Sequence, residues 1–300
     1  MSLLNKIDFA VIIGVHNANP NGDPLNGNRP RQTSERLGEI SDVCLKRKIR
    51  NRLLAMGEEI YVQSDDNRID ECRSLKERFD KSNIKIEDIR KDASQKWFDV
   101  RAFGQVFALK ETKGKKDSDV EGQNSSSGVS VGIRGPVTIQ SAFSLRQIVP
   151  ESLQITKSTN LETDKKNPDK KGADTMGMKH RVSEAIYVAY GAISPQLASK
   201  TGFSASDAEK IKLALRSLYE GDDSSARPAG SMEIIAVIWC QHDSSCGQFS
   251  SATVHRTLKE SISRDGQIER ERMKEKLPNL DIQVLKQLEG EELAQLMTMP

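Results

Sequence analysis

The feature that most constrains this fold is a short apolar run near the N-terminus that ends abruptly in a long polar turn. Residues Ile7–Val15 are rich in β-branched side chains, which is typical of a buried strand. The next stretch, His16–Gln32, contains five Asn, three Pro and two Gly. Pro fixes φ, whereas Asn and Gly accept positive φ. We therefore predict a strand that leads directly into a compact, rigid loop.

The remaining pattern predicts an α+β fold. A helix is expected over Ser41–Met56, where apolar residues recur at helical spacing after Ser41 or Asp42 as N-cap, and Gly57 is a plausible end. A second helix is expected over Ser204–Gly221. Strand-like segments surround it. The order strand, helix, strand, strand, helix, strand is that of the ferredoxin-like plan shared by RNA-recognition motifs.

The ferredoxin-like plan needs fewer than about 100 residues, so much of the chain must be insertion. We predict one domain, 1–300, whose basic pattern occupies about 7–56, 129–153 and 182–241. Large insertions fall at about 57–128 and 155–181, and 242–300 reads as a weakly helical extension. Within the first insertion, the polar Gly/Ser-rich stretch Glu111–Gly128 predicts a flexible loop.

Composition limits the possible functions. The formal net charge is only +2, so a nucleic-acid surface must arise from local clustering of Lys and Arg. The four Cys form no CxxC pair, which argues against zinc and for free thiols. No cofactor or metal is expected. The N-terminus lacks a signal-peptide pattern, and its apolar run is too short to cross a bilayer. These observations favour a cytoplasmic protein without a membrane partner.

The first predicted helix is strongly basic. It sets Lys46, Arg47, Lys48, Arg50 and Arg52 against a single acid, Asp42. Like charges at i,i+4 repel one another, and a polyanion would relieve the repulsion while releasing counterions. We expect these cations to line both margins of the apolar stripe, unneutralised by protein. The alternative is a solvated face whose cations pair with acids elsewhere in the chain.

The polar turn upstream adds further candidates for RNA contact. Its Asn19 and Asn21 amides offer donors and acceptors, and its end carries Arg29 and Arg31. Such a loop suits sugar and phosphate contacts, although a plain structural turn competes as an explanation. A metal site that uses Asp23 is weaker, because calcium loops employ several carboxylates.

Two later stretches complete the candidate site. Arg134 is flanked by Gly132 and Gly135, where Gly lets another backbone approach closely, and a β-bulge is the simpler explanation. Ser152–Arg181 is a Lys-rich excursion bracketed by strand-like runs, which predicts a projecting hairpin with a disordered tip in the free monomer. Its candidate contacts are Lys157, Lys179 and His180.

Five segments together resemble a known family. The segments "NANPNGDPLNGNRPR", "DVCLKRKIRN", "DVRAFGQVFA", "IRGPVTIQSAF" and "DTMGMKHRV…YVAYGAIS" run in this order from about Ile7 to about Trp239. They resemble the type I-C CRISPR-associated backbone subunit, the repeating guide-RNA-binding subunit of the Cascade surveillance complex. The related type I-B subfamily shares the N-terminal signature.

The resemblance implies a modified RNA-recognition palm with finger-like insertions and a thumb hairpin at roughly Ile155–Arg181. Copies would stack head to tail along CRISPR guide RNA and present it for pairing with a target DNA strand. The large, small and guide-processing subunits of Cascade would be further partners. On this resemblance Lys46 and Arg50 are the first choices for holding the guide backbone. The implied role is a non-catalytic scaffold.

Two other functions compete with the scaffold. Backbone subunits of type III complexes resemble this family and cut RNA with an Asp in a loop, which makes Asp23 a candidate and Asp99 a poorer one. A single carboxylate without a partner gives only weak support for a two-metal catalytic site. A metabolic enzyme whose Asn/Gly loop cradles phosphate is the other alternative, and it leaves the basic helix unexplained.

Overall fold

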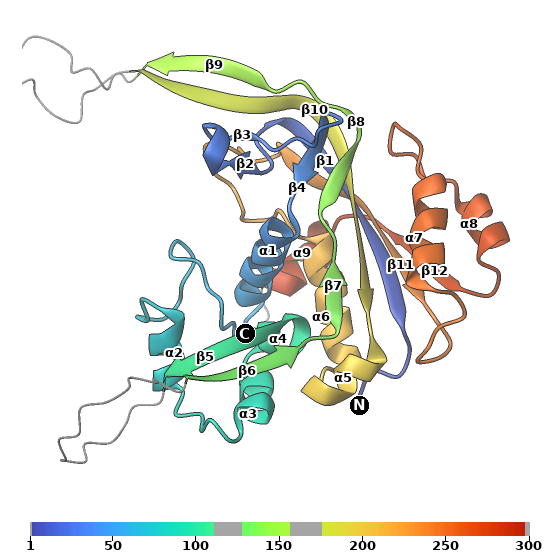
Figure 1. Ribbon diagram of the computed structural model, residues 1–300. Coiled ribbons are helices and arrows are strands. Elements are labelled where there is room, and N and C mark those ends of the chain that lie inside the picture. The colour runs from blue at the N-terminus through green and yellow to red at the C-terminus, as the bar shows by residue number, and fades with distance from the viewer. Residues whose placement is uncertain (1, 111–127, 157–175, 298–300) are drawn as a thin grey trace, which may run out of the picture.

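The computed structural model describes residues 2–110, 128–156 and 176–297, and it is built around an antiparallel sheet of eight strands (Figure 1). The strand order is β12-β11-β1-β10-β8-β4, with β7 and β9 also pairing along β10. The strands are β1 (Ile7–Ala18), β4 (Leu37–Ile40), β7 (Val137–Ile139), β8 (Ala142–Gln147), β9 (Glu151–Thr156), β10 (Met176–Ile193), β11 (Met232–Gln241) and β12 (Asp281–Leu285).

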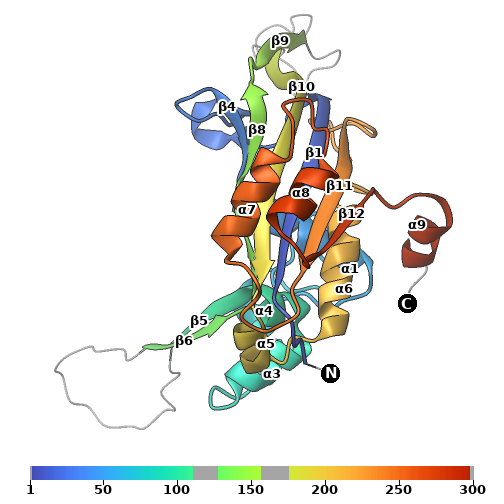
Figure 2. The same cartoon turned by 90° about the vertical axis from the view of Figure 1, so that its right-hand side faces the viewer.

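Helices cover both faces of this sheet. Figure 1 shows α1 and α6 on one side of β1 and β11, and Figure 2 shows α7 and α8 on the other. The helices are α1 (Asp42–Ala55), α2 (Leu75–Lys81), α3 (Ile89–Lys96), α4 (Phe98–Phe103), α5 (Pro195–Thr201), α6 (Ala205–Arg216), α7 (Ser251–Glu260), α8 (Arg270–Lys276) and α9 (Gly290–Met297).

Strand β1 is buried on both faces, which explains its continuous apolar sequence. Phe9 and Val11 point into the core shared with α1 and α6, whereas Ala10 and Ile12 point into the core under α7 and α8. The strand pairs with β10 on one side and β11 on the other. The predicted strand is confirmed, and it extends to Ala18.

Both predicted helices form with the predicted caps. Ser41 Oγ accepts a hydrogen bond from Cys44 N at the start of α1, and Gly57 follows its end with φ of 86°. Ser204 and Asp207 form a capping box at α6. An acidic N3 residue can satisfy the N-cap backbone N–H in this way, which fixes where a helix starts.

The insertion after α1 has a small core of its own. It contains α2, α3 and α4 and the two-stranded sheet of β5 (Gly104–Lys110) and β6 (Gly128–Arg134). The rings of Tyr61 and Trp97 lie 4.6 Å apart between centroids, and those of Tyr61 and Phe107 lie 5.2 Å apart. These aromatic contacts let the insertion pack as a unit beside the main sheet. The predicted loop, Glu111–Gly128, lies outside the described residues except for Gly128, which begins β6.

The Lys-rich excursion begins and ends as a two-stranded ribbon. Strand β9 pairs with the first part of β10, from Met176 opposite Thr156 to Arg181 opposite Glu151. Figure 1 shows this ribbon projecting from one end of the sheet. The described part therefore agrees with a projecting hairpin, and its predicted tip, with Lys157, lies outside the described residues.

The C-terminal sixty residues correct one expectation. They are not merely a weakly helical tail, because α7 and α8 pack on the second face of the sheet, with Val254 and Leu258 fully buried. Strand β12 extends the sheet along β11. Leu296 of α9 reaches the core that contains α1 and α6. The polar composition of this region hid a few well-spaced apolar residues that anchor it.

The four Cys are free thiols, and Cys240 is fully buried at the end of β11, as a small hydrophobe would be. Within the described residues, every helix is too short or too polar to cross a membrane.

Candidate nucleic-acid interface

The Asn/Pro/Gly turn folds into a rigid hairpin, as predicted. Strands β2 (Gly22–Asp23) and β3 (Arg29–Pro30) flank the 3₁₀ turn Pro24–Asn26. Asp23 Oδ1 accepts from Leu25 N at 3.2 Å, and Asn28 takes a positive φ of 59°. A Cβ on Gly22 would lie 2.0 Å from Asn28 Oδ1, so any larger residue there would force the Asn28 side chain to move.

The two Asn side chains that were predicted to contact RNA make hydrogen bonds within the protein. Asn21 Oδ1 accepts from both the backbone N (2.9 Å) and the Oγ (3.0 Å) of Ser41, the N-cap of α1. Asn19 is 4% exposed, and its Nδ2 donates to Asn28 O at 2.7 Å. The structure thus supports the structural explanation for these two side chains: Asn21 holds the hairpin against the start of α1, and Asn19 fastens the hairpin to itself.

The two arginines at the end of the turn remain accessible. Arg29 is exposed and makes no ion pair within the described part of the chain. Arg31 is 35% exposed and lies 3.8 Å from Asp23 Oδ1, at the margin of an ion pair. Arg36, which the sequence pattern did not single out, is exposed nearby along the chain with a positive φ of 62°. Exposed cations on a fixed backbone can meet a phosphate without prior rearrangement.

Helix α1 does not present unneutralised cations, and that prediction is wrong. Lys46 Nζ lies 3.0 Å from Asp42 Oδ2, one turn earlier in the helix. Arg47 Nη2 lies 2.9 Å from Asp66 Oδ1 in the insertion. Both pairs remain solvent-accessible, and exposed ion pairs are typically worth only about 0–1 kcal/mol. The alternative, in which these cations pair with acids elsewhere, is the one that the structure shows.

The deeper cations of α1 are part of the core. Lys48 is 4% exposed and forms an ion pair with Asp222 of the α6–β11 connection. Burial lowers the pKa of Lys48, and the Asp222 carboxylate partly opposes this shift. Arg50 Nε lies 2.9 Å from Asp99 Oδ2, and Asp99 is 1% exposed. Arg52 is also buried and donates to Ser217 Oγ at 2.8 Å. These side chains join α1 to α4 and to the connection between α6 and β11.

Arg134 lies at the exposed end of β6, opposite Gly104. The expected close approach of backbones is confirmed at Gly135, where a Cβ would lie 2.2 Å from Ala102 O. It is not found at Gly132, where a Cβ would meet nothing within 4 Å among the described residues. In Figure 1 this end of β6 lies far from the β9–β10 ribbon, so Arg134 is separated from the other candidates.

Lys179 and His180 lie at the base of the ribbon, on opposite faces of β10 because successive side chains of a strand alternate. His180 Nδ1 lies 2.9 Å from Ser152 Oγ across the strands. Lys179 is half-buried opposite Leu153 and has no ion-pair partner within the described ranges. Strand β3 contacts β10, and both Figures 1 and 2 place the hairpin beside the ribbon base. The hairpin, with Arg29 and Arg31, and the ribbon base, with Lys179 and His180, are therefore neighbouring elements.

Both carboxylates considered for RNA cleavage make hydrogen bonds that hold the local backbone in place. Asp99 accepts from Tyr61 N at 2.7 Å and from Val62 N at 3.1 Å, in addition to Arg50. Asp23 caps the 3₁₀ turn. Among the described residues, no three His, Cys, Asp or Glu side chains are placed to hold a metal ion.

The fold and site define an α+β protein with a central antiparallel sheet, a projecting ribbon, and accessible basic residues where the two meet. A model of the family described as CRISPR-associated protein Cas7 matches residues 5–284. The chain belongs to this family, which confirms the family resemblance, while the I-C subtype stays a prediction.

Individual relatives were also found. A CRISPR-associated protein Cas7 from Haloferax volcanii is 25% identical over 226 residues, which cover 70% of this chain and 63% of the relative. The chain thus spans less than two thirds of that relative's length. One chain of a solved CRISPR RNA-guided surveillance complex has a TM-score of 0.48 and 16% identity, and covers 97% of this chain and 92% of its own. Another, from a complex described as pre-nicking, has a TM-score of 0.42 and 12% identity over 78% of each chain.

Proposed function

We propose that this chain is a non-catalytic RNA-binding subunit that polymerises along CRISPR guide RNA to form the Cascade backbone in antiviral defence. Membership of the Cas7 family supports this proposal. The observation that carries it is the set of accessible basic residues on two neighbouring elements, a rigid hairpin and a projecting ribbon. Other copies, Cascade subunits and a target DNA strand are the partners, and the cytoplasm is the compartment.

The strand order supports an RNA-recognition-like palm. Strands β11, β1, β10 and β8 lie side by side and antiparallel, with α1 following β1 and α6 following β10. This is the order of the split βαβ plan. The insertion at 57–128 would form the fingers, and the hairpin at 155–181 would be the thumb. Helices cover both faces of the sheet, with α7 and α8 of the extension at 242–300 on the second face, so the guide runs over the hairpin and the ribbon and not over the sheet itself.

The proposed guide contacts follow from accessibility. Arg29, Arg31 and Lys179 hold phosphates, and His180 adds a polar contact at the ribbon base. Arg134 is a separate contact at the far end, and Lys157 belongs to the thumb. Lys46 and Arg47 are secondary, because each must first leave a carboxylate. Lys48 and Arg50 support the site from inside. Contacts of this kind read backbone and not bases, which suits a subunit that must accept any guide.

Binding of a labelled, guide-length single-stranded RNA tests this proposal. The triple variant R29A/R31A/K179A removes three proposed phosphate contacts, so the slope of log K against log salt should fall by about 2. The matched control K81A/R272A/K274A removes three exposed cations that are already ion-paired and lie outside the proposed contacts, and it should leave the slope unchanged. Equal losses in both variants, or no RNA binding by the wild type at low salt, would overturn the proposal.

The non-catalytic part has its own test. Labelled RNA incubated with the purified chain and Mg²⁺ should remain intact over hours. Cleavage that disappears in Asp23→Ala would make the chain a ribonuclease instead. Asp23→Asn keeps most of the shape of the side chain, and it separates a chemical role from loss of the hairpin cap.

A further inference from the structure

The turn between the Asn hairpin and β4 holds an arginine in a backbone conformation that arginine rarely adopts. Arg36 has a φ of 62°, in the left-handed region. Side chains other than glycine are disfavoured there because the Cβ crowds the backbone, although Asn tolerates it better than most. The other non-glycine residues with positive φ in the described chain are all Asn, namely Asn17, Asn28, Asn83 and Asn279. Arg36 is therefore the exception among the described residues, and its conformation needs an explanation.

The hydrogen bonds of the turn require the left-handed conformation. Thr33 N donates to Leu37 O at 2.8 Å, and Arg36 N donates to Thr33 O at 3.0 Å. This pattern closes a hairpin with a three-residue loop, 34–36, and the last residue of such a loop is usually a glycine in the left-handed region. The sequence therefore places an arginine where a glycine would fit without strain.

The turn is fastened to the base of the ribbon. Ile148, which lies between β8 and β9, donates its backbone N–H to Arg36 O at 2.9 Å. Gln147 Nε2 donates to Glu35 O at 3.0 Å, and Gln32 Nε2 donates to Ile148 O at 2.8 Å. A strained conformation persists only where its surroundings fix it, and these three hydrogen bonds do so. They also fix the position of the Arg36 backbone between the Asn hairpin and the ribbon.

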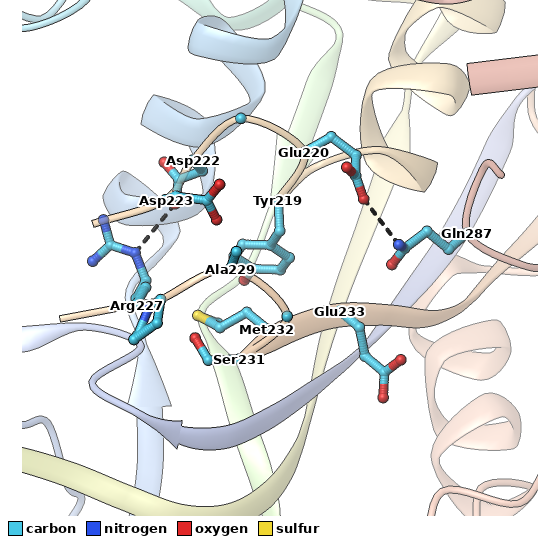
Figure 3. Close-up of a pocket in the computed structure, with 13 residues that line it drawn as sticks. Tyr219, Glu220, Asp222, Asp223, Arg227, Ala229, Ser231, Met232, Glu233 and Gln287 are labelled. Atoms are coloured by element: carbon cyan, nitrogen blue, oxygen red, sulfur yellow. Dashed lines mark hydrogen bonds and ion pairs between the residues drawn. The ribbon is translucent and has the colours of Figure 1, made fainter. Parts of the chain in front are cut away.

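The Arg36 side chain has no polar partner in the described chain that would account for the strain. It is exposed and makes neither an ion pair nor a hydrogen bond with any described residue, although Glu35 and Glu39 are close in sequence. Figure 3 shows the contrasting case of Arg227, whose Nε lies 3.2 Å from Asp222 Oδ2 in the α6–β11 connection. Backbone strain is concentrated at sites that bind or react, so the free guanidinium of Arg36 points to a ligand outside the chain.

We propose that Arg36 binds a phosphate of the RNA backbone where the strand passes from the Asn hairpin to the ribbon. The turn follows the hairpin directly along the chain and is hydrogen-bonded to the ribbon base, so its cation lies between these two elements. A guanidinium offers parallel N–H donors that match two phosphate oxygens, and a backbone fixed in advance lowers the entropy lost on binding. The inference rests on the proposed function, and it adds a contact that no sequence pattern indicated.

Binding of a labelled, guide-length single-stranded RNA to the full-length chain, followed over a range of salt concentrations, tests the inference. Arg36→Asn removes the cation and suits the left-handed backbone, so the slope of log K against log salt should fall by about 0.7. Arg36→Lys keeps the charge and should keep the slope, with a weaker affinity because the guanidinium fork is lost. Arg90→Gln is the control, because it removes an exposed cation of α3 that has no ion pair in the described chain. It should leave the slope unchanged.

Urea denaturation adds a readout that separates an RNA contact from a structural role. Arg36→Asn relieves the backbone strain, so it should lower the equilibrium constant for unfolding about fivefold while it weakens RNA binding. A loss of stability together with a loss of binding would show that Arg36 holds the turn, and would overturn the inference. An unchanged slope in Arg36→Asn, or an equal fall in Arg90→Gln, would overturn it while the wild type still binds RNA. Absence of binding by the wild type at low salt would instead overturn the proposed function, and this inference with it.

Discussion

Helix α1 and the Asn hairpin both carry clustered cations in the sequence, and the fold leaves those cations differently accessible. Every Lys of the helix, together with Arg47 and Arg50, meets a carboxylate. On the hairpin, Arg29 stays exposed and Arg31 only approaches Asp23, at 3.8 Å. The difference arises because the helix lies between the sheet, the insertion and the α6–β11 connection, whereas the hairpin projects beside the ribbon. A cluster of Lys and Arg in the sequence therefore shows where cations lie along the chain. Their burial in the fold decides whether they can contact a ligand.

The largest effect on stability is expected from removing the buried partner of an α1 cation. Asp99→Ala removes the acceptor of Arg50 Nε and of two backbone N–H groups, so it leaves charge and donors buried without partners. We expect a loss of about 3 kcal/mol in the free energy of unfolding. Urea denaturation measures it. Asp66→Ala, which removes an exposed partner of Arg47, should cost less than about 0.5 kcal/mol.

The second-largest effect on stability is expected from the Lys48–Asp222 ion pair, which joins α1 to the α6–β11 connection. Burial already lowers the pKa of Lys48, and Asp222 is the group that raises it. In Asp222→Asn the folded state disfavours protonated Lys48, which should cost about 2 kcal/mol near pH 7. A Lys whose folded pKa is depressed regains stability as pH rises toward its unfolded value of about 10.4. The deficit should therefore shrink between pH 7 and about pH 10.

Urea denaturation of the wild type and the Asp222→Asn variant at several pH values checks this direction. Asp223→Asn is the natural control, because the neighbouring carboxylate makes no ion pair within the described ranges. A deficit that grows with pH would contradict the assignment of Lys48 as the titrating group.

The elements near the N-terminus could be predicted from sequence because their signals are local. The apolar run of β1, the Ser41 cap and the Ser204–Asp207 box depend on residues within a few positions of one another. The rigidity of the hairpin follows for the same reason, since Asn28 and Gly22 need particular backbone angles or space. Local rules of propensity and capping are sufficient for such features.

The state of the basic helix could not be predicted in this way. The partner of Lys48 lies 174 residues away in the chain, and that of Arg50 lies 49 residues away. No pattern around either Lys48 or Arg50 indicates which distant carboxylate the fold will bring to it. Only the Asp42–Lys46 pair, at i,i+4, was readable from spacing. The C-terminal extension was missed because its anchors, such as Val254 and Leu258, are few among polar residues.

A smaller effect is expected where the two regions join. Asn21→Ala removes the acceptor of both the backbone N and the Oγ of Ser41, and so frees the hairpin from the start of α1. Loss of these hydrogen bonds should cost about 1 kcal/mol of stability, measured by urea denaturation. RNA affinity should fall as well, because Arg29 and Arg31 would no longer be held in place. Asn26→Ala, at the exposed apex, should change neither quantity.

The smallest effect on stability is expected from a substitution in α1 that can be compared directly with one in the hairpin. Lys46→Gln removes a cation held by Asp42 in an exposed pair, so the free energy of unfolding should change by less than about 0.5 kcal/mol. RNA binding, followed by fluorescence anisotropy, should keep its salt slope, whereas Arg29→Gln should lower the slope by about 0.7. If both variants lower it equally, the Asp42–Lys46 pair opens when RNA binds. The helix would then act as a second phosphate surface, and the contrast with the hairpin would hold only for the free protein.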